Sequence, residues 1–322
     1  MAVLITGVAG FIGSNLASHF LNQGKKVFGV DNFARGTESN LAQIISNSNF
    51  YFKKVDISRI NDYRIVFDKF IVHDVIAEVW HMAANSDILA GAEDPDIDLR
   101  DTFMTTFNTV KLMKDYGIKI LSFASSSAIY GDFGSQLIEE TSGPLLPISN
   151  YGAMKLASEA IISAAVESHL DQVYIFRFPN VVGTPATHGV ILDFVRSLKK
   201  SLSKLAVLGN GSQQKGYIHV EELLDAMFFI RSNANEKIAI FNIGAEDVGV
   251  TVKSIAEEVV ASFYPKAEIV FGVGNKGWIG DVPIFIYSTK KLKNLGWISQ
   301  LNSKQAIQKA ISQIIQQEAN SK

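Results

Sequence analysis

The stretch TGVAGFIGS places Gly7, Gly10 and Gly13 between an apolar segment at 2–7 and an amphipathic segment at 11–24. The first segment predicts a buried strand and the second predicts a helix. A loop at this junction turns tightly and lets a pyrophosphate approach the backbone, which side chains would prevent. The start of the following helix offers unpaired N–H groups and a partial positive charge to the anion. The stretch therefore predicts a strand–loop–helix unit that binds a dinucleotide.

An acidic residue at the end of the next apolar segment supports this interpretation. Asp31 closes the segment 26–31, where a carboxylate accepts hydrogen bonds from a ribose diol and repels a 2′-phosphate. This favours NAD over NADP, although Arg35 lies close enough in sequence to weaken the preference. Asp56 follows the third apolar segment, where it can meet an adenine amino group. The alternative is a set of turn glycines followed by a solvated aspartate.

Apolar segments alternate with helix-length segments through the first half of the chain. This alternation predicts parallel strands joined by right-handed crossovers, with helices on both faces of one sheet. The predicted strands are 2–7, 26–31, 50–57, 76–83, 119–127 and 172–178. The fold class that follows is α/β, a doubly wound parallel sheet of Rossmann type.

The regularity weakens after residue 180, where glycine and proline interrupt the pattern. Helical patterns recur in this half at 190–200, 220–232, 251–263 and 303–317. We therefore expect a smaller, mixed α/β domain that binds the substrate. The predicted boundaries give 1–178 to the dinucleotide-binding domain, with 217–245 returning to it, and 179–216 and 246–322 to the substrate-binding domain.

Composition excludes several classes of function. The 322 residues carry a net charge of −2 without a large basic cluster, which argues against a nucleic-acid partner. The absence of cysteine excludes disulfides and fits a reducing cytosol, and the six histidines lack metal-ligand spacing, so no metal is expected. No apolar run approaches 18 residues and no signal peptide precedes the first strand, so we expect a cytoplasmic protein without a membrane partner.

The stretch YGAMK (151–155) sets Tyr151 four residues before Lys155, one helical turn apart. A free tyrosine has a pKa of about 10 and is a poor base, and a neighbouring ammonium lowers that pKa. Such pairs also occur on surface helices without chemistry. The serines in SFASSSAIYG (122–131) favour chemistry, because hydroxyls at the carboxyl end of a strand in an open α/β sheet lie where ligands bind.

These motifs together resemble a known family, the extended short-chain dehydrogenase/reductases. Within it they are similar to the NAD-dependent nucleotide-sugar epimerase/dehydratase group, of the UDP-glucose 4-epimerase type. The resemblance rests on the glycine loop, Asp31, HMAA (81–84), the serines before Tyr130 and YGAMK. It continues through RFPNVVG (177–183), GNGSQQKGYIHVEEL (209–223), IGDVP (279–283) and LGW (295–297), so it covers nearly the whole chain.

The resemblance implies roles for particular residues. Ser126 takes the place of the family's catalytic Ser/Thr, Tyr151 that of the acid/base, and Lys155 that of the residue that lowers the tyrosine pKa and holds the nicotinamide ribose. The implied cofactor-binding residues are Gly7, Gly10, Phe11, Ile12, Gly13, Asp31, Asn32, Arg35, Asp56, Ile57, Ala83, Ala84, Tyr151 and Lys155. The implied substrate-binding residues are Ser86, Ser127, Asn180, His188, Lys215 and Trp278.

The sequence departs from the family pattern at three substrate-side positions. Thr102 stands where the family has Asn near the substrate, Lys215 replaces Arg, and Trp278 stands where Arg is common. A lysine ammonium is a point charge and cannot form the paired hydrogen bonds of an arginine guanidinium, so it would bind a diphosphate differently. Trp278 can stack on a ring or fill the core, and a loop residue such as His188 is often only a structural hydrogen-bonding group. The departures leave the nucleotide and the sugar open.

The resemblance also favours one reaction, because residues that other reactions of the family need are absent. Family dehydratases carry an Asp-Glu pair directly after the catalytic Ser/Thr and decarboxylases carry Glu there, whereas this chain has Ser127 and Ala128. An epimerase acting at C4 through a transient 4-ketosugar is therefore favoured, with a UDP-sugar as substrate. A ketosugar reductase with the same residues and a non-catalytic NAD sensor stay open. The family also implies a homodimer that packs through the helices at 99–116 and 151–168.

Overall fold

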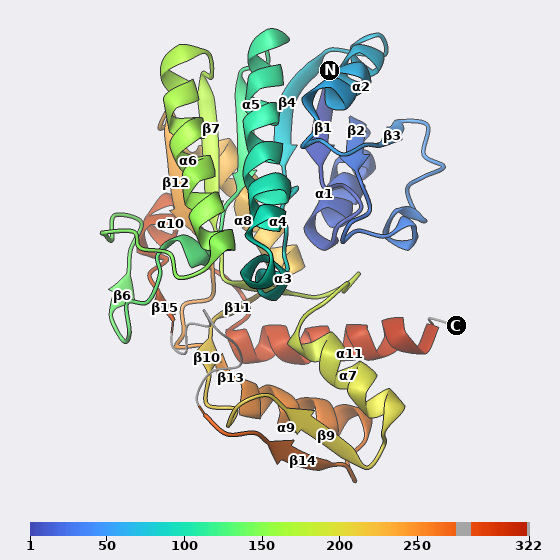
Figure 1. Ribbon diagram of the computed structural model, residues 1–322, viewed down its shortest axis with the longest axis vertical. Helices are drawn as coiled ribbons and strands as arrows, with labels where there is room; N and C mark the ends of the chain where they lie inside the picture. The colour runs from blue at the N-terminus through green and yellow to red at the C-terminus, as the bar shows by residue number, and fades with distance from the viewer. Residues whose placement is uncertain (275–284, 321–322) are drawn as a thin grey trace. The chain divides into compact units, whose positions relative to one another are not determined.

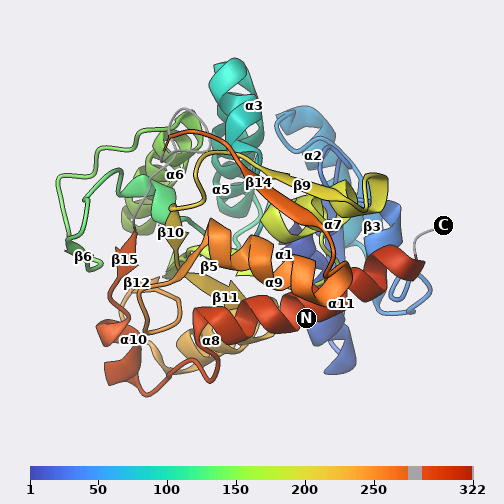
Figure 2. The ribbon, with the colours of Figure 1, turned by 90° about the horizontal axis from the view of Figure 1, so that it is seen from below.

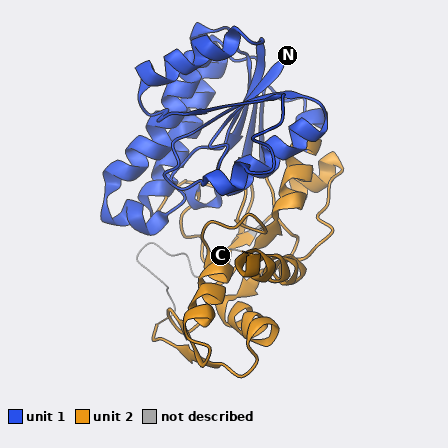
Figure 3. Ribbon diagram, turned by 90° about the vertical axis from the view of Figure 1, so that its right-hand side faces the viewer, with its two compact units in different colours: residues 1–129, 149–177, 230–241 blue, residues 130–148, 178–229, 242–322 orange. Residues whose placement is uncertain are grey.

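The computed structural model describes residues 1–274 and 285–320, and the chain divides into two compact units (Figure 3). The first unit consists of Met1–Ile129, Ser149–Arg177 and Ile230–Phe241, and the second of Tyr130–Ile148, Phe178–Phe229 and Asn242–Lys322. Residues 130–148, 217–229 and 242–245 lie in the second unit, whereas the sequence placed them with the dinucleotide-binding domain.

The first unit is built from strands that alternate with helices (Figure 1). Its elements in chain order are β1 (Ala2–Thr6), α1 (Phe11–Asn22), β2 (Lys26–Asp31), η1 (Glu38–Leu41), β3 (Phe50–Lys54), α2 (Ile60–Ile71), β4 (Ile76–His81), α3 (Ile88–Glu93), α4 (Pro95–Asp98), the π-helical η2 (Leu99–Met104), α5 (Thr105–Asp115), β5 (Ile120–Ala124), η3 (Ser127–Ile129), α6 (Asn150–Ser168), β7 (Gln172–Arg177) and β12 (Ile238–Asn242).

Seven strands within the described residues form one sheet in the order β12-β7-β5-β4-β1-β2-β3. The pairings among β3, β2, β1, β4, β5 and β7 are all parallel. The strand order reverses after β3, so the carboxyl ends of β1 and β4 lie at the switch point, the position where open α/β sheets bind ligands. The Rossmann-type prediction is confirmed, and each of the six predicted strands is present: β2 has the predicted bounds, and the other five differ by a few residues at an end.

The core of the first unit forms because its strands read as continuous apolar runs, which both faces of a parallel sheet require. Side chains from α2, α5 and α6 pack with the strands in one cluster that includes Phe28, Phe67, Leu121 and Ile162. Figure 1 shows α5 and α6 side by side, and residues of the two helices are in contact. This packing fixes α6, the helix that carries Tyr151 and Lys155, against the sheet.

The second unit combines short strands with longer helices. Its elements are β6 (Leu137–Ile138), β8 (Asn180–Val182), α7 (Val190–Lys200), β9 (Lys204–Val207), β10 (Gln214–Lys215), β11 (Tyr217–His219), α8 (Val220–Asn233, whose last turn belongs to the first unit), β13 (Val250–Thr251), α9 (Val252–Phe263), β14 (Glu268–Phe271), β15 (Ile286–Tyr287), α10 (Lys290–Leu295) and α11 (Ser303–Asn320). The strands pair two by two, as β11 with β8 and β14 with β9, both parallel, and β10 with β13 antiparallel.

The second unit has its own core between three helices. Figures 1 and 2 show α7, α9 and α11 side by side, and they share a cluster of buried residues. Ile307, Ile311 and Ile314 lie in that cluster and Ile315 packs against it, and their spacing places them on one face of α11. Among the described residues no helix has both the length and the apolar character needed to cross a membrane.

Candidate active site

The glycine loop between β1 and α1 is shaped by atoms that leave no room for side chains. Gly7 has φ +66°, and a Cβ there would lie 2.8 Å from the backbone of Ala83. A Cβ on Gly13 would lie 2.1 Å from the Gly7 carbonyl oxygen. Gly10 is the N-cap residue of α1, so no side chain bonds to the first N–H groups of this helix, all of whose residues are described. The first turn of α1 also holds no acidic residue. The cradle fits a dinucleotide pyrophosphate, whose charge the exposed N–H groups and the helix dipole stabilise.

Asp31 ends β2 beside this loop and is nearly buried. Its Oδ2 accepts from the Ala9 amide at 2.9 Å and its Oδ1 from the Phe33 amide at 2.7 Å. Burial raises the pKa of the carboxyl, and the backbone hydrogen bonds act against that rise. The neighbouring Arg35 forms an ion pair with Asp87 at 2.8 Å. Asp31 is thus tied to the backbone of the glycine loop, which orients its carboxylate.

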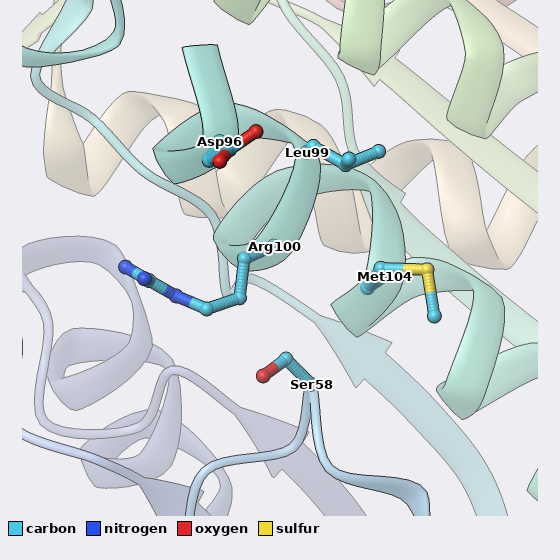
Figure 4. A pocket seen from close by; sticks show the side chains of 5 residues that line it. All are labelled: Ser58, Asp96, Leu99, Arg100 and Met104. Atoms are coloured by element: carbon cyan, nitrogen blue, oxygen red, sulfur yellow. The ribbon is translucent and has the colours of Figure 1, made fainter. Parts of the chain in front are cut away.

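The turn after β3 forms another part of this region. Asp56 accepts from the Ser58 amide and hydroxyl at 3.0 and 2.7 Å, and Asn108 donates to the Ile57 carbonyl at 3.0 Å. A pocket of about 430 Å³ opens beside the turn (Figure 4). Ser58 lines the pocket from the turn, and α4 and η2 supply Asp96, Leu99, Arg100 and Met104. Sequence patterns did not indicate this pocket, because it depends on how η2 packs beside the turn.

Lys155 lies deep in the first unit although it is a cation. Ser149 caps the helix α6, accepting from the Gly152 amide at 3.1 Å, so the helix begins just before Tyr151. The Lys155 side chain is 1% exposed, and its Nζ donates to the Ala124 carbonyl at 2.6 Å. The Nζ also lies 4.7 Å from the centre of the Phe123 ring and 5.9 Å from that of Tyr151. Burial lowers the pKa of Lys155 to about 7.

Tyr151 and Ser126 are brought together, since their side chains share a hydrogen bond. The carboxyl end of β5 leads into η3, where the Ser126 Oγ accepts from the Ala128 amide at 3.1 Å. Burial raises the pKa of Tyr151 to about 12, a hydrogen bond with the Ser126 side chain lowers it, and the charge of Asp98 raises it further. The net direction is opposite to the predicted lowering by Lys155, because removal of the phenolate from water outweighs the stabilising groups.

A buried ion pair that the sequence did not reveal lies behind these residues. Glu159 follows Lys155 by one turn on α6, and Arg177 ends β7. Arg177 donates to both Glu159 oxygens, at 3.0 and 2.6 Å, and Ser125 donates to the same carboxylate at 2.5 Å. All three side chains are at most 6% exposed. The network joins α6, β5 and β7 next to Ser126, and the spacing of four between Lys155 and Glu159 was its one sequence signal.

Asp98 is a second buried carboxylate that sequence patterns did not single out. It ends α4, is fully buried, and accepts through Oδ1 from Asn85 at 2.9 Å and from Thr102 at 3.4 Å. Its Oδ2 has no hydrogen-bond partner among the described residues. Thr102, which stands where the family has Asn, is therefore a partner of Asp98. The i,i+4 spacing of Asp98 and Thr102 on a helix could have indicated this pair.

The two buried histidines, His81 and His219, form hydrogen bonds through their ring nitrogens. His81 at the end of β4 bonds through Nδ1 to the Thr6 hydroxyl at 2.7 Å and through Nε2 to the Thr106 hydroxyl at 3.0 Å. Burial lowers the pKa of His81 to about 3, with a smaller effect from the charge of Lys155. In the second unit, His219 bonds to Gln313 at 2.9 Å. Within the described ranges no group of three or more acidic and histidine side chains could hold a metal ion.

The predicted substrate residues fall in different parts of the chain. Ser86 is exposed after β4, and Ser127 is half-buried at the start of η3, both in the first unit. The structure places Asn180, His188 and Lys215 in the second unit. Asn180 is exposed at the start of β8, His188 bonds through Nδ1 to the Thr187 hydroxyl at 2.9 Å, and Lys215 ends β10. Trp278 lies outside the described residues.

Comparison with known proteins adds to this geometry. Residues 3–244 match the NAD dependent epimerase/dehydratase family. The chain is 25% identical to the UDP-glucuronate 4-epimerase of Thermodesulfobacterium geofontis over 315 residues, 96% of this chain and 94% of the relative. It is 28% identical to the UDP-glucose 4-epimerase of Halalkalibacterium halodurans over 276 residues, 80% and 79% of the two chains.

A solved structure gives the same result for the fold. The UDP-glucose 4-epimerase of Thermus thermophilus in complex with NAD superposes with a TM-score of 0.83 at 27% identity, covering 98% of this chain and 99% of the other. The chain therefore belongs to the NAD dependent epimerase/dehydratase family, an assignment that confirms the resemblance of its motifs. It is an enzyme of this family with NAD as its cofactor, as the sequence predicted.

Proposed function

We propose that this enzyme is a nucleotide-sugar 4-epimerase that works through a transient 4-ketosugar. The observation that carries the proposal is that Ser126, Tyr151 and Lys155 lie together at the carboxyl end of β5. In addition, Ser127 and Ala128 stand where dehydratases and decarboxylases of the family carry carboxylates. Without that carboxylate no group beside Ser126 drives elimination of water. The relatives named as UDP-sugar 4-epimerases support the same reaction.

The three residues divide the proton chemistry between them. Tyr151 takes the proton from the sugar 4-hydroxyl and returns it after the sugar has turned its other face, while Ser126 holds the same oxygen by a hydrogen bond. Lys155, fixed by the Ala124 carbonyl, stabilises the phenolate form of Tyr151. NAD, when bound, supplies the group that accepts and returns the hydride at C4.

The residues proposed to hold NAD lie in the first unit. The loop from Gly7 to Gly13, with Phe11 and Ile12, would bind the pyrophosphate at the start of α1. Asp31, with Asn32 and Arg35, would bind the adenosine ribose, and Asp56 and Ile57 the adenine. Ala83 and Ala84, after β4, would border the nicotinamide half. The first unit is on this proposal the dinucleotide-binding part, and the second unit contributes substrate residues.

The proposed substrate is a UDP-sugar, since the relatives and the solved structure act on UDP-sugars by name. Asn180 and Lys215 would bind the diphosphate, with Ser86, Ser127, His188 and Trp278 at the sugar or the base. We also propose a homodimer formed through α5 and α6. Leu99 and Phe107 support this proposal, since these large apolar side chains are 45% and 40% exposed near and on α5. Light scattering coupled to gel filtration tests the dimer, and a monomeric mass at micromolar concentration would contradict it.

The reaction is tested by product analysis. The purified protein is incubated with NAD and a panel of UDP-, dTDP-, GDP- and CDP-sugars without added reductant, and products are resolved by ion-pair chromatography with mass detection. A new peak of unchanged mass supports the epimerase, and its absence with Tyr151→Phe assigns it to this site. A product lighter by one water would refute the inference that Ser127 and Ala128, which lack carboxylates, exclude a dehydratase. Activity that requires NADH and a ketosugar would show a reductase instead.

A further inference from the structure

Arg35 follows Asp31, the residue proposed to bind the adenosine ribose, but its side chain is held elsewhere. Its guanidinium forms an ion pair with Asp87 at 2.8 Å. Asp31 ends β2, whereas Asp87 lies between β4 and α3, and β1 separates β2 from β4 in the sheet. The ion pair therefore joins segments from opposite sides of β1. It holds the Arg35 guanidinium at the segment that follows β4, away from the strand end that carries Asp31.

The backbone of Arg35 nevertheless stays close to Asp31. The segment begins with a tight turn, in which the Asp31 carboxylate accepts from the Phe33 amide at 2.7 Å. Gly36 then packs on the glycine loop, where a Cβ would lie 2.6 Å from the Ala9 carbonyl carbon. The Ala9 amide itself donates to the Asp31 carboxylate at 2.9 Å. The long Arg35 side chain, once released from its ion pair, is therefore placed to meet a phosphate on a ribose at Asp31.

Asp87 is the fixed partner of the pair. Its Oδ1 caps α3 by accepting from the Ala90 amide at 3.1 Å, and its own amide donates to Asn85 at 2.9 Å. The other oxygen, Oδ2, is the one that faces Arg35. Both side chains of the pair are partly exposed, at 40% for Arg35 and 32% for Asp87, and exposed ion pairs are weak. The guanidinium is thus held by a carboxylate of fixed position, from which a change at Asp87 would release it.

We propose that Asp87 is a positioning residue that sharpens the choice of NAD over NADP by withdrawing Arg35 from the adenosine ribose. An arginine beside this ribose is the residue type that accommodates a 2′-phosphate, through paired charge-assisted hydrogen bonds. While Asp87 holds the guanidinium, the charge of Arg35 does not offset the repulsion between Asp31 and such a phosphate. This role rests on the proposed placement of the ribose at Asp31, and it holds whichever reaction the enzyme catalyses.

Lys54 is a second cation near Asp31, and it is engaged as well. The two residues are partners in the register of β2 and β3, and the Lys54 Nζ lies 5.3 Å from the centre of the Phe33 ring. A lysine ammonium is a point charge without the paired donors of a guanidinium. Of these two cations, Arg35 is therefore the one whose release would change the recognition of a 2′-phosphate more.

The test is a competition between the two cofactors. The full-length protein is equilibrated with NAD and increasing excesses of NADP, and native mass spectrometry resolves the two loaded forms, which differ by one phosphate group. We expect Asp87→Asn to raise the ratio of bound NADP to bound NAD by about three- to fivefold, because NADP no longer has to break an exposed ion pair to reach Arg35. Asparagine is as good a helix cap as aspartate, so the fold should be retained.

Asp94→Asn is the matched control, because Asp94 is an exposed aspartate that caps α4 as Asp87 caps α3. It should leave the ratio unchanged. The double variant Arg35→Gln/Asp87→Asn should return the ratio to that of Arg35→Gln alone, which assigns the effect to the guanidinium. A rise that persists in the double variant, or an unchanged ratio in a folded Asp87→Asn protein, would overturn the proposal.

Two single variants complete the test. If Asp87→Asn does not fold, Arg35→Gln decides: the ratio should stay close to that of the wild type, because Arg35 is already withdrawn. A fall as large as the expected rise would show that Arg35 serves a 2′-phosphate in the wild type, and would overturn the proposal. Asp31→Asn tests the placement of the ribose separately. It should raise the ratio because a repelling charge is removed, and an unchanged ratio would refute that placement.

Discussion

The glycine loop and the Tyr151–Lys155 centre lie in the same unit, but they specify function by different physical means. The glycine loop depends on the absence of side chains, since a Cβ on Gly13 would come within 2.1 Å of the Gly7 carbonyl oxygen. The centre works by charge balance, since Lys155, Asp98, Glu159 and Arg177 are ionisable and nearly or fully buried. The loop should therefore tolerate changes of charge better than changes of volume, and the centre should show the reverse.

The largest expected effect is on catalysis at the centre. Tyr151→Phe removes one oxygen and little volume, so the fold and the affinity for NAD should be retained. Epimerisation should fall by about 10²–10⁴-fold, because the general acid/base is lost. Steady-state rates and NAD titration by fluorescence check both parts. A variant that loses NAD binding to the same extent as its rate would show that the centre also depends on shape.

The next effect concerns the ion pair behind the centre. Glu159→Gln keeps the volume but leaves Arg177 buried without a counter-charge, and we expect a loss of about 3–5 kcal/mol in the free energy of unfolding. Urea denaturation at pH 7 measures it. Glu167→Gln, an exposed change on the same helix, serves as the matched control and should stay within about 0.5 kcal/mol. Equal losses in both variants would contradict the special role of the buried pair.

A smaller loss of stability is expected in the loop. Gly13→Ala adds one methyl group without charge and should cost about 1–3 kcal/mol through overpacking. It should also weaken NAD binding, since the loop must shift away from the position that fits the pyrophosphate. Gly10→Ala should be milder, because its Cβ would come no closer than 3.2 Å to the Gly7 oxygen. Calorimetric NAD titrations of both variants give the ranking, and a reversed order would refute the steric explanation.

The smallest effect concerns the pH dependence of stability that His81 causes. His81 lies between the two regions: it bonds to the Thr6 hydroxyl beside the glycine loop, and the charge of Lys155 lowers its pKa slightly. Its pKa is lowered from 6.5 to about 3 by burial. Between these values the unfolded chain holds a proton that the folded chain lacks, so stability falls as the pH falls, by up to about 1.4 kcal/mol per pH unit. His81→Asn should flatten this slope, as urea denaturation at pH 6.5 and 5 would show.

Local sequence patterns predicted what depends on neighbours in the chain. The strands followed from apolar runs, and the loop followed from glycines at a strand–helix junction. The sequence did not show the strand β12, Ile238–Asn242, because its place in the sheet depends on pairing beside β7, which lies far away in the chain. The same holds for Asp98 and for the partnership of Glu159 with Arg177, since their bonds join residues that only the fold brings together.

The protonation of Tyr151 shows a further limit of local patterns. The spacing of Tyr151 and Lys155 predicted a lowered pKa, and the structure places the two groups as expected, with the Nζ 5.9 Å from the ring centre. Their burial reverses the direction, raising the pKa of Tyr151 to about 12. A motif predicts the distance between two groups, but how far they are exposed to water depends on the whole fold.

The edge strand β12 also bears on how the protein is made. The sheet of the first unit ends with β12, which is synthesised long after β7, once residues 178–229 of the second unit have been made. Until β12 leaves the ribosome, the outer edge of β7 has open backbone donors and acceptors, such as the Val173 amide that later bonds to Lys237. The nascent chain is thus open to strand pairing with other chains during this interval. Any truncation that removes β12 would make that exposure permanent.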